Sequence, residues 1–172
     1  MTKMATLLFT LALTAAAGAQ SPNILARFDG GVGVIPAQAG AGTANEDLTL
    51  PNVKPNIVRG VNPGAGPWTI GSLKATIETN GHITVDGRGL VLASGNAIGT
   101  PAGVNVFATL ICETSVPFVA HSTSVSVPLD PNGDFRFDDT LSNLPQSCTS
   151  PVLLIRAAAG TGPWLAAGLP KN

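Results

Sequence analysis

Charged and aromatic side chains are scarce in this sequence. Only 11% of its 172 residues are charged, tyrosine is absent, and the formal net charge is −1, without runs of one sign. This pattern argues against a surface for nucleic acid or for an anionic membrane. It also disfavours long surface helices, while the many Gly, Ala, Val, Thr and Ser residues favour β-sheet.

The motifs of common enzyme classes are missing as well. The sequence has no G-x-S-x-G nucleophile elbow and no phosphate-binding loop, and its acidic residues fall mainly in turns. We therefore predict no catalytic residues and no cofactor. A small secreted hydrolase stays as an alternative, because serines, His121 and Asp130 are the residue types of a catalytic triad.

The one long apolar run lies at the N-terminus. Lys3 precedes apolar residues 4–17, and the small residues that follow are those that signal peptidase reads. We predict a signal peptide over residues 1–19, cleaved between Ala19 and Gln20, because the run is too short to span a bilayer. The mature protein is expected to be secreted, without a transmembrane segment or a lipid anchor.

The only two cysteines are Cys112 and Cys148. Two thiols in an oxidising compartment usually pair, so we predict a disulfide bond between them. Closing this loop is expected to stabilise the fold by roughly 3 to 4 kcal/mol through the unfolded state. Two buried free thiols are the alternative.

The chain divides at about residue 66. Residues 20–66 are rich in Gly and Pro and show no periodic element. We predict a Gly/Pro-rich N-terminal arm or strap there, in which Leu48–Leu50 and Ile57–Val58 form short edge strands or cover the domain. A partly ordered linker is the alternative.

From residue 67 the pattern takes the period of two that is typical of strands. About seven strands separated by turn signals predict an all-β domain over residues 67–172. The expected fold is a two-sheet antiparallel β-sandwich, immunoglobulin-like or prealbumin-like, with one disulfide. We place its strands near residues 73–78, 82–86, 104–112, 123–129, 135–137, 151–159 and 164–169.

The strand over residues 104–112 is expected to be central, because Phe107 and Ile111 make its second face apolar too. An uncovered apolar patch at these two side chains would mark a binding surface. Two hairpins are also predicted, one at Asn80-Gly81 and one over residues 129–139, where Pro131 begins a tight turn.

The second hairpin contains Asp130 to Asp134, which superficially matches a calcium loop. Its glycine stands at the fourth position instead of the sixth, and Leu141 replaces the bidentate Glu. We therefore interpret it as a structural turn, although Asp138-Asp139 leaves a weak cation site open. His82 and His121 are expected to be solvent-exposed, and no metal site is predicted.

Both tryptophans follow a Gly-x-Gly-Pro sequence, Trp68 at residues 64–67 and Trp164 at residues 160–163. Exposed at strand ends, they would form an aromatic platform for a sugar or a protein partner, and they are our candidate ligand-binding residues. The alternative is that both are packing anchors for the first and last strands.

The run from Ser126 to Phe137, with Cys148 ahead of a Val-Leu-Leu strand, resembles the Asp-x-x-Gly-x-Phe hairpin of transthyretin-like and carboxypeptidase-regulatory-like sandwich modules. Such modules are usually non-catalytic, which the resemblance implies for this chain. We expect a secreted module with a structural, surface or binding role toward an extracellular protein or glycan. A carbohydrate-binding module with a Trp platform, and assembly through edge strands, are further alternatives.

Overall fold

The computed structural model describes residues 23–38 and 54–171. These ranges contain strands, turns and loops but no helix, so the predicted all-β class is confirmed. It follows that no helix in the described ranges is long and apolar enough to cross a membrane. The predicted signal peptide over residues 1–19 and the piece Leu48–Leu50 lie outside the described residues.

Thirteen strands occur in the described ranges, and their ladders are antiparallel. Most of the predicted strands are confirmed, as β5, β6, β8, β11, β12 and β13. The strands are β1 (Ile24–Gly33), β2 (Ala37–Gln38), β3 (Lys54–Pro55), β4 (Trp68–Thr69), β5 (Ser72–Glu78), β6 (His82–Arg88), β7 (Val91–Leu92), β8 (Asn105–Ile111), β9 (His121–Ser122), β10 (Val127–Pro128), β11 (Phe135–Thr140), β12 (Val152–Ala157) and β13 (Trp164–Pro170).

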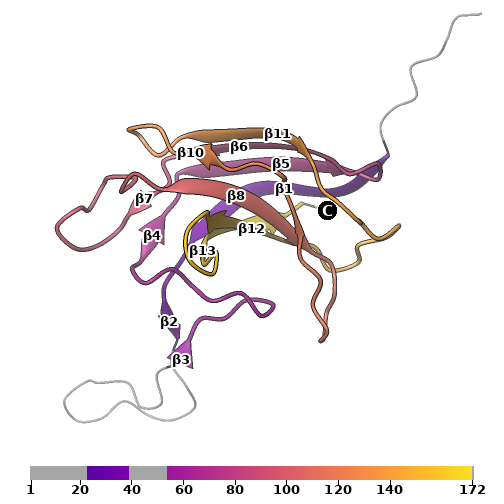
Figure 1. Ribbon diagram of the computed structural model, residues 1–172, viewed down its shortest axis with the longest axis horizontal. Coiled ribbons are helices and arrows are strands. Elements are labelled where there is room, and N and C mark those ends of the chain that lie inside the picture. The colour runs from indigo at the N-terminus through magenta and orange to yellow at the C-terminus, as the bar shows by residue number, and fades with distance from the viewer. Residues whose placement is uncertain (1–22, 39–53, 172) are drawn as a thin grey trace, which may run out of the picture.

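One curled sheet contains most of these strands. Its hydrogen-bonded path runs β10-β8-β12-β13-β1-β5-β6-β11, and β9 pairs with β8 off this path. The path bends into a half-barrel (Figure 1). We expected about seven strands in two separate sheets, and the structure differs because β1 pairs with β13 on one side and β5 on the other, which joins the two halves.

The sequence showed us no periodic element before residue 67, and this interpretation is wrong for β1. Within β1, Ala26 and Phe28 are buried whereas Arg27 and Asp29 are exposed, so the alternation is real but short. It stops at Gly30, which has φ 104° and lies where the register with β13 shifts. A bulge of this kind hides a strand from pattern reading.

The two ends of the sheet, β10 and β11, are joined by the tight turn that the sequence predicted. The β-hairpin expected over residues 129–139 is wrong, because β10 pairs with β8 and β11 pairs with β6. Gly133 N–H donates to the Asp130 carbonyl at 2.9 Å, and Gly133 has φ 80°, which an L side chain rarely adopts. Beyond the turn, Thr123 forms a β-bridge with Leu141. The turn and this bridge therefore bring the open edges of the half-barrel together.

The single strand predicted over residues 123–129 is wrong, since only β9 and β10 form at its margins. A side chain makes hydrogen bonds with backbone groups that a regular strand would pair with another strand. The Thr123 hydroxyl accepts from the Ala108 amide and donates to the Val125 carbonyl. Such side-chain bonds compete with a regular ladder.

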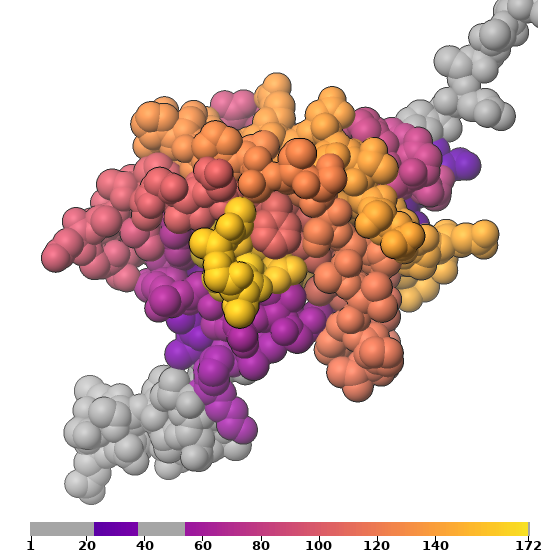
Figure 2. Space-filling model, viewed as in Figure 1, coloured from indigo at the N-terminus to yellow at the C-terminus, as the bar shows by residue number. Residues whose placement is uncertain are grey.

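The core lies on the inner side of the curl. Alternate residues of β5 and β6 are buried, whereas β8 and β12 bury consecutive residues and are covered there on both faces. Burial of each Leu or Ile stabilises the fold by about 1.5–3 kcal/mol. The loops between β7 and β8 and between β8 and β9 project from this body (Figure 2). The largest fully buried core side chains include Leu73, Ile77, Ile83, Leu110, Phe137 and Leu153.

The predicted disulfide bond between Cys112 and Cys148 is confirmed, with an S–S distance of 2.06 Å. It joins the residue after β8 to the loop that precedes β12, across a sequence separation of 36. Because β8 and β12 are paired neighbours in the sheet, the bond reinforces an existing contact.

Candidate functional site

Both tryptophans lie in the interior. Trp68 is 7% exposed and Trp164 is 3% exposed. The indole Nε1–H of Trp164 donates to the Asn56 carbonyl at 3.0 Å, and the Trp164 carbonyl accepts from the Gly64 amide at 2.9 Å. As placed, the rings present no platform, and the packing-anchor alternative accounts for their contacts. Ligand binding by these tryptophans stays a prediction that requires uncovered ring faces.

The expectation that both histidines are solvent-exposed is wrong for His121. This residue is 4% exposed, and its Nδ1 lies 3.1 Å from the Ser142 carbonyl, to which it donates. The side chain thereby connects β9 to the loop after β11. His82 differs, because 40% of its side chain is exposed at the start of β6.

The acidic residues of the calcium-like turn are used by the backbone. Asp130 accepts from the Asn132 and Asp134 amides at 2.8 and 2.9 Å, and Asp134 accepts from the Gly89 amide at 3.0 Å. These bonds brace the turn and connect it to the chain after β6. Within the described ranges no three His, Cys, Asp or Glu side chains gather as metal ligands.

The apolar outer side of β8 is covered at Ile111 and partly covered at Phe107. Ile111 is 1% exposed, and the Arg156 guanidinium lies over the Phe107 ring at 5.0 Å from its centroid. Arg156 Nε donates to the Gly162 carbonyl at 2.6 Å, and partial burial lowers the pKa of this guanidinium. Ile111 is therefore buried and Phe107 is half-buried under Arg156, so these two side chains do not form a wholly uncovered apolar patch.

Charge gathers instead on the outward side of β1, β5, β6 and β11, which we call the polar sheet face. Five of the eight Lys and Arg side chains in the described ranges belong to it. Four of them lie on these strands, and the fifth, Lys171, follows β13 and reaches the face by pairing with Asp29 of β1. The four are Arg27, Lys74, Arg88 and Arg136, and the three cations elsewhere are Lys54, Arg59 and Arg156.

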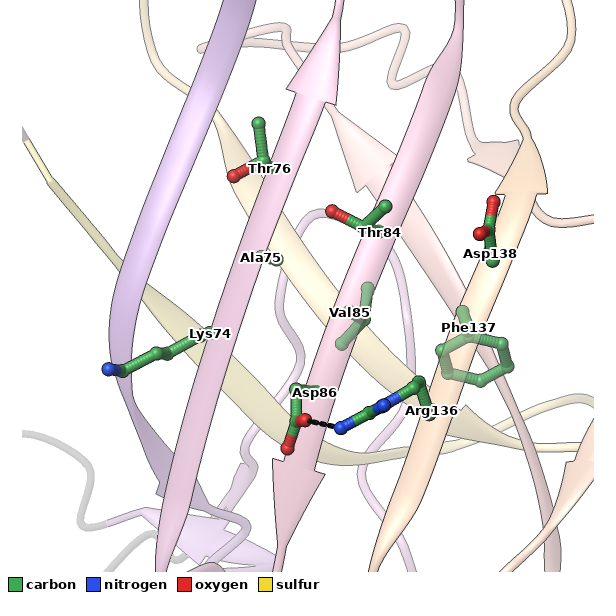
Figure 3. A pocket seen from close by; sticks show the side chains of 9 residues that line it. All are labelled: Lys74, Ala75, Thr76, Thr84, Val85, Asp86, Arg136, Phe137 and Asp138. Carbon is green, nitrogen blue, oxygen red and sulfur yellow. Dashed lines mark hydrogen bonds and ion pairs between the residues drawn. The ribbon is translucent and has the colours of Figure 1, made fainter.

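A shallow hollow of about 320 Å³, here called the trough, lies in the middle of this face. Thr76 on β5 and Thr84 on β6 are cross-strand partners, and their short hydroxyl side chains form its floor (Figure 3). Longer side chains rise around them. The rim consists of Lys74, Asp86, Arg136 and Asp138.

Charges of alternating sign form a row across the sheet beside the trough. Lys74 has Asp29 as its cross-strand partner on β1 and Asp86 as its partner on β6. Asp86 forms an ion pair with Arg136 of β11, drawn in Figure 3. Opposite charges at adjacent strand positions stabilise a sheet by about 0.2–1 kcal/mol each, so the row helps to hold these side chains in place.

The acidic members of the row are kept ionised by their partners. A hydrogen bond from the Lys171 ammonium at 2.8 Å holds the pKa of Asp29 below its ordinary value. Hydrogen bonds from the Arg88 and Arg136 guanidinium groups lower the pKa of Asp86 in the same way. The row therefore keeps its charge pattern well into the acid range.

A histidine lies on the same face, two residues from Thr84 along β6. His82 Nε2 lies 2.8 Å from Asp138 Oδ1, and His82 Nδ1 lies 3.5 Å from Glu78 Oε1. The hydrogen bond to Asp138, followed by that to Glu78, raises the pKa of His82 above its ordinary value. Protonation of this one ring changes the charge at the edge of the face.

A second hollow, of about 260 Å³ and here called the side groove, adjoins the trough on the β1 side. Arg27, Lys74 and Lys171 line it with a single acid, Asp29, which is paired with Lys171. Among the described residues Arg27 and Lys74 have no ion-pair partner within 4.0 Å.

The sequence predicted only part of this face. The alternation in β5 and β6 correctly directed Lys74, Thr76 and Thr84 outward, but no site was inferred from them. Arg27 and Asp29 were missed together with β1. The signal that could have found them is the run Ala26 to Asp29, where apolar and charged residues alternate.

Comparisons of the chain with protein-family models, with curated proteins and with solved structures find no match.

Proposed function

We propose that this protein is a secreted, non-catalytic binding module that presents its polar sheet face to a partner outside the cell. One observation carries the proposal: a chain with few charges places five of its eight described cationic side chains on one side of one sheet. Charges of both signs grouped on one face can match complementary charges of a partner. The trough at the centre supplies hydroxyl groups for hydrogen bonds.

The environment of the histidines supports a non-catalytic role. A hydrolase of the triad type needs a Ser or Thr hydroxyl within hydrogen-bond reach of a His ring. His82 contacts the carboxylates of Glu78 and Asp138, and His121 contacts a backbone carbonyl. Within the described ranges no hydroxyl hydrogen-bonds either ring, which gives the hydrolase alternative no support.

Export to an oxidising compartment agrees with the disulfide bond between Cys112 and Cys148. Structural disulfides persist in such compartments and are rare where thiols are kept reduced. The apolar run over residues 4–17 is the second support, as the core of a signal peptide. Localisation of the full chain, with cleavage mapped by N-terminal sequencing, tests this part of the proposal.

We also propose that the fold is a variant of the two-layer sandwich, in which β1 joins the layers. Its support is that β5 and β6 bury side chains in the same core as β8 and β12. The resemblance to transthyretin-like modules belongs to this proposal and rests on the sequence of the turn, Asp130 to Phe135.

The binding role is tested with immobilised polysaccharides and extended peptides, using the mature chain and two variants. Thr84→Arg fills the floor of the trough, whereas Thr69→Arg makes the same change at an exposed position on β4. We expect binding to at least one probe, abolished by Thr84→Arg and retained by Thr69→Arg. Equal binding by both variants, or no binding to any probe, would contradict the proposal.

A further inference from the structure

The side groove differs from the rest of the surface in its charge. Its three cations, Arg27, Lys74 and Lys171, face one carboxylate, whereas the whole chain has a formal net charge of −1. Resting on the proposed function, we infer that this groove binds the carboxylate or sulfate groups of an acidic polysaccharide. The local excess of positive charge, set against a weakly negative molecule, is the first support.

The register of β1 and β5 brings the two unpaired cations to one anion. Arg27 lies opposite Thr76, and Lys74 lies two positions from Thr76 on the same side of β5. Diagonal neighbours in an antiparallel pair are about 7–8 Å apart, within reach of two long side chains. An anionic group between them receives a bidentate Arg contact, a Lys contact and a hydroxyl hydrogen bond from Thr76.

A backbone hydrogen bond to β1 fixes the position of Lys171. Its amide donates to the Arg27 carbonyl at 2.9 Å, which extends the pairing of β13 with β1 by one residue. Its ammonium is already paired with Asp29 at 2.8 Å. That pair engages the one acid of the groove. Among the described residues Arg27 and Lys74 stay without an ion-pair partner within 4.0 Å, although Lys74 has Asp29 and Asp86 as cross-strand neighbours.

The lining of the two hollows favours a polysaccharide over a protein or a membrane. Every apolar residue of the lining is buried, so the surface offers no aromatic or aliphatic anchor of the kind that dominates protein interfaces. Membrane docking needs an inserted apolar side chain or a longer basic cluster. These buried lining residues are Phe28, Ala75, Val85 and Phe137.

The side groove and the trough share Lys74 and Thr76, so they form one continuous polar path. An extended polysaccharide with an acidic group in the side groove places its next sugar units over Thr84. Hydroxyl-rich sugar units match the hydroxyl floor there through donor and acceptor pairs. Acid recognition and hydroxyl recognition thus lie side by side, as a sugar polymer requires.

The test measures binding of the mature chain to alginate, heparin and dextran, which carry carboxylates, sulfates and no charge respectively. Arg27→Gln and Lys74→Gln remove the two unpaired cations, and Lys54→Gln, on β3, removes an exposed one elsewhere. We expect each groove variant to bind alginate or heparin about tenfold more weakly than wild type. The control, Lys54→Gln, is expected to bind as tightly as wild type. Added salt is expected to weaken the wild-type interaction.

Equal loss in Lys54→Gln and Lys74→Gln would overturn the inference, because attraction to overall charge would then explain binding. Binding of dextran in preference to both acidic polymers would also overturn it. If dextran binding is lost in Thr84→Arg, the proposed function still holds while the anionic ligand class fails. Circular dichroism spectra and unfolding midpoints of the variants exclude loss of the fold as a cause.

Discussion

The ring of Phe135 lies across Gly87, its cross-strand partner on β6. A Cβ atom built on Gly87 would overlap the far end of this ring, so the aromatic side chain occupies the place that a side chain of Gly87 would take. Phe135 also contacts Phe137 edge to face, with ring centroids 5.7 Å apart. The aromatic ring thus covers a glycine that would otherwise leave a gap in the core.

Gly87→Ala is expected to destabilise the protein by about 1–3 kcal/mol, because the ring of Phe135 must move within a packed core. Gly66→Ala is the matched control, since its added Cβ would meet only Leu92 Cδ2 at 3.8 Å. Both glycines lack a positive φ, so the comparison isolates packing from backbone strain. Urea unfolding measures the difference, and equal midpoints for the two variants would contradict this packing.

Reduction of the disulfide between Cys112 and Cys148 is expected to lower stability by about 3–4 kcal/mol, since a loop of this length constrains the unfolded chain. The measurement is the thermal midpoint with and without reductant. A Cys112→Ala/Cys148→Ala double variant, insensitive to reductant, controls for effects on the rest of the chain. No change in the wild-type midpoint on full reduction would argue against a stabilising role.

His82 is expected to titrate above its ordinary pKa of about 6.5, because Asp138 and Glu78 stabilise its protonated form. A raised pKa in the folded state contributes stability below the unfolded value, and this contribution is lost as pH rises through the folded value. The contribution is small, since the pair is exposed. NMR titration of the ring protons, assigned with His82→Gln, measures the pKa.

The two carboxylates are expected to act unequally on His82. Asp138→Asn should lower its pKa more than Glu78→Gln does, since the distances to the ring are 2.8 and 3.5 Å. An equal or reversed order would show that the pairing across β6 and β11 is not the main cause.

Asp139 on β11 connects one end of the sheet to residues 124 and 125, which precede β10 at the other end. This junction is here called the seam. The Asp139 carboxylate accepts from the Ser124 amide at 2.8 Å and from the Val125 amide at 3.3 Å. We expect Asp139→Asn to cost about 1–3 kcal/mol, as charged hydrogen bonds of this kind do. The neighbouring Asp138→Asn, at a side chain 80% exposed, should cost under about 1 kcal/mol.

The seam also predicts acid sensitivity. Partial burial acts to raise the pKa of Asp139, but the hydrogen bonds that it accepts outweigh burial and hold this pKa below its ordinary value. A lowered folded pKa gives stability above the unfolded value of about 3.9, which is lost as pH falls through the folded value. Unfolding midpoints compared between neutral and acidic pH should fall less in Asp139→Asn than in wild type. A parallel fall would contradict this role.

Local patterns predicted the strands and turns that have regular alternation. The hairpin at Asn80-Gly81, the tight turn at Pro131 to Gly133 and strand β8 could be inferred from neighbouring residues. The disulfide bond followed from the presence of only two cysteines in a chain with a predicted export signal. The curl of the sheet could not be inferred from local patterns, because it depends on the pairing of β1. Its glycines and bulge interrupt the period of two after only a few residues.

The candidate site was harder to predict than the fold. Trp68 and Trp164 were predicted as ligand-binding residues because aromatic residues are rare in the sequence. The burial of their rings depends on contacts distant in the sequence, such as that of Trp164 with Asn56. The polar sheet face joins residues from strands as far apart as β1 and β11. Cross-strand neighbours such as Asp29 and Lys74 are visible only once the register is known.

Chemical-shift mapping tests the central claim, that the polar sheet face is the binding surface. Isotope-labelled protein is titrated separately with alginate and dextran oligosaccharides, and amide shifts are followed. We expect at least one titration to perturb amides clustered around Arg27, Lys74, Thr76 and Thr84. Shifts confined to the projecting loops over residues 93–104 and 113–120, or no shifts in either titration, would contradict it.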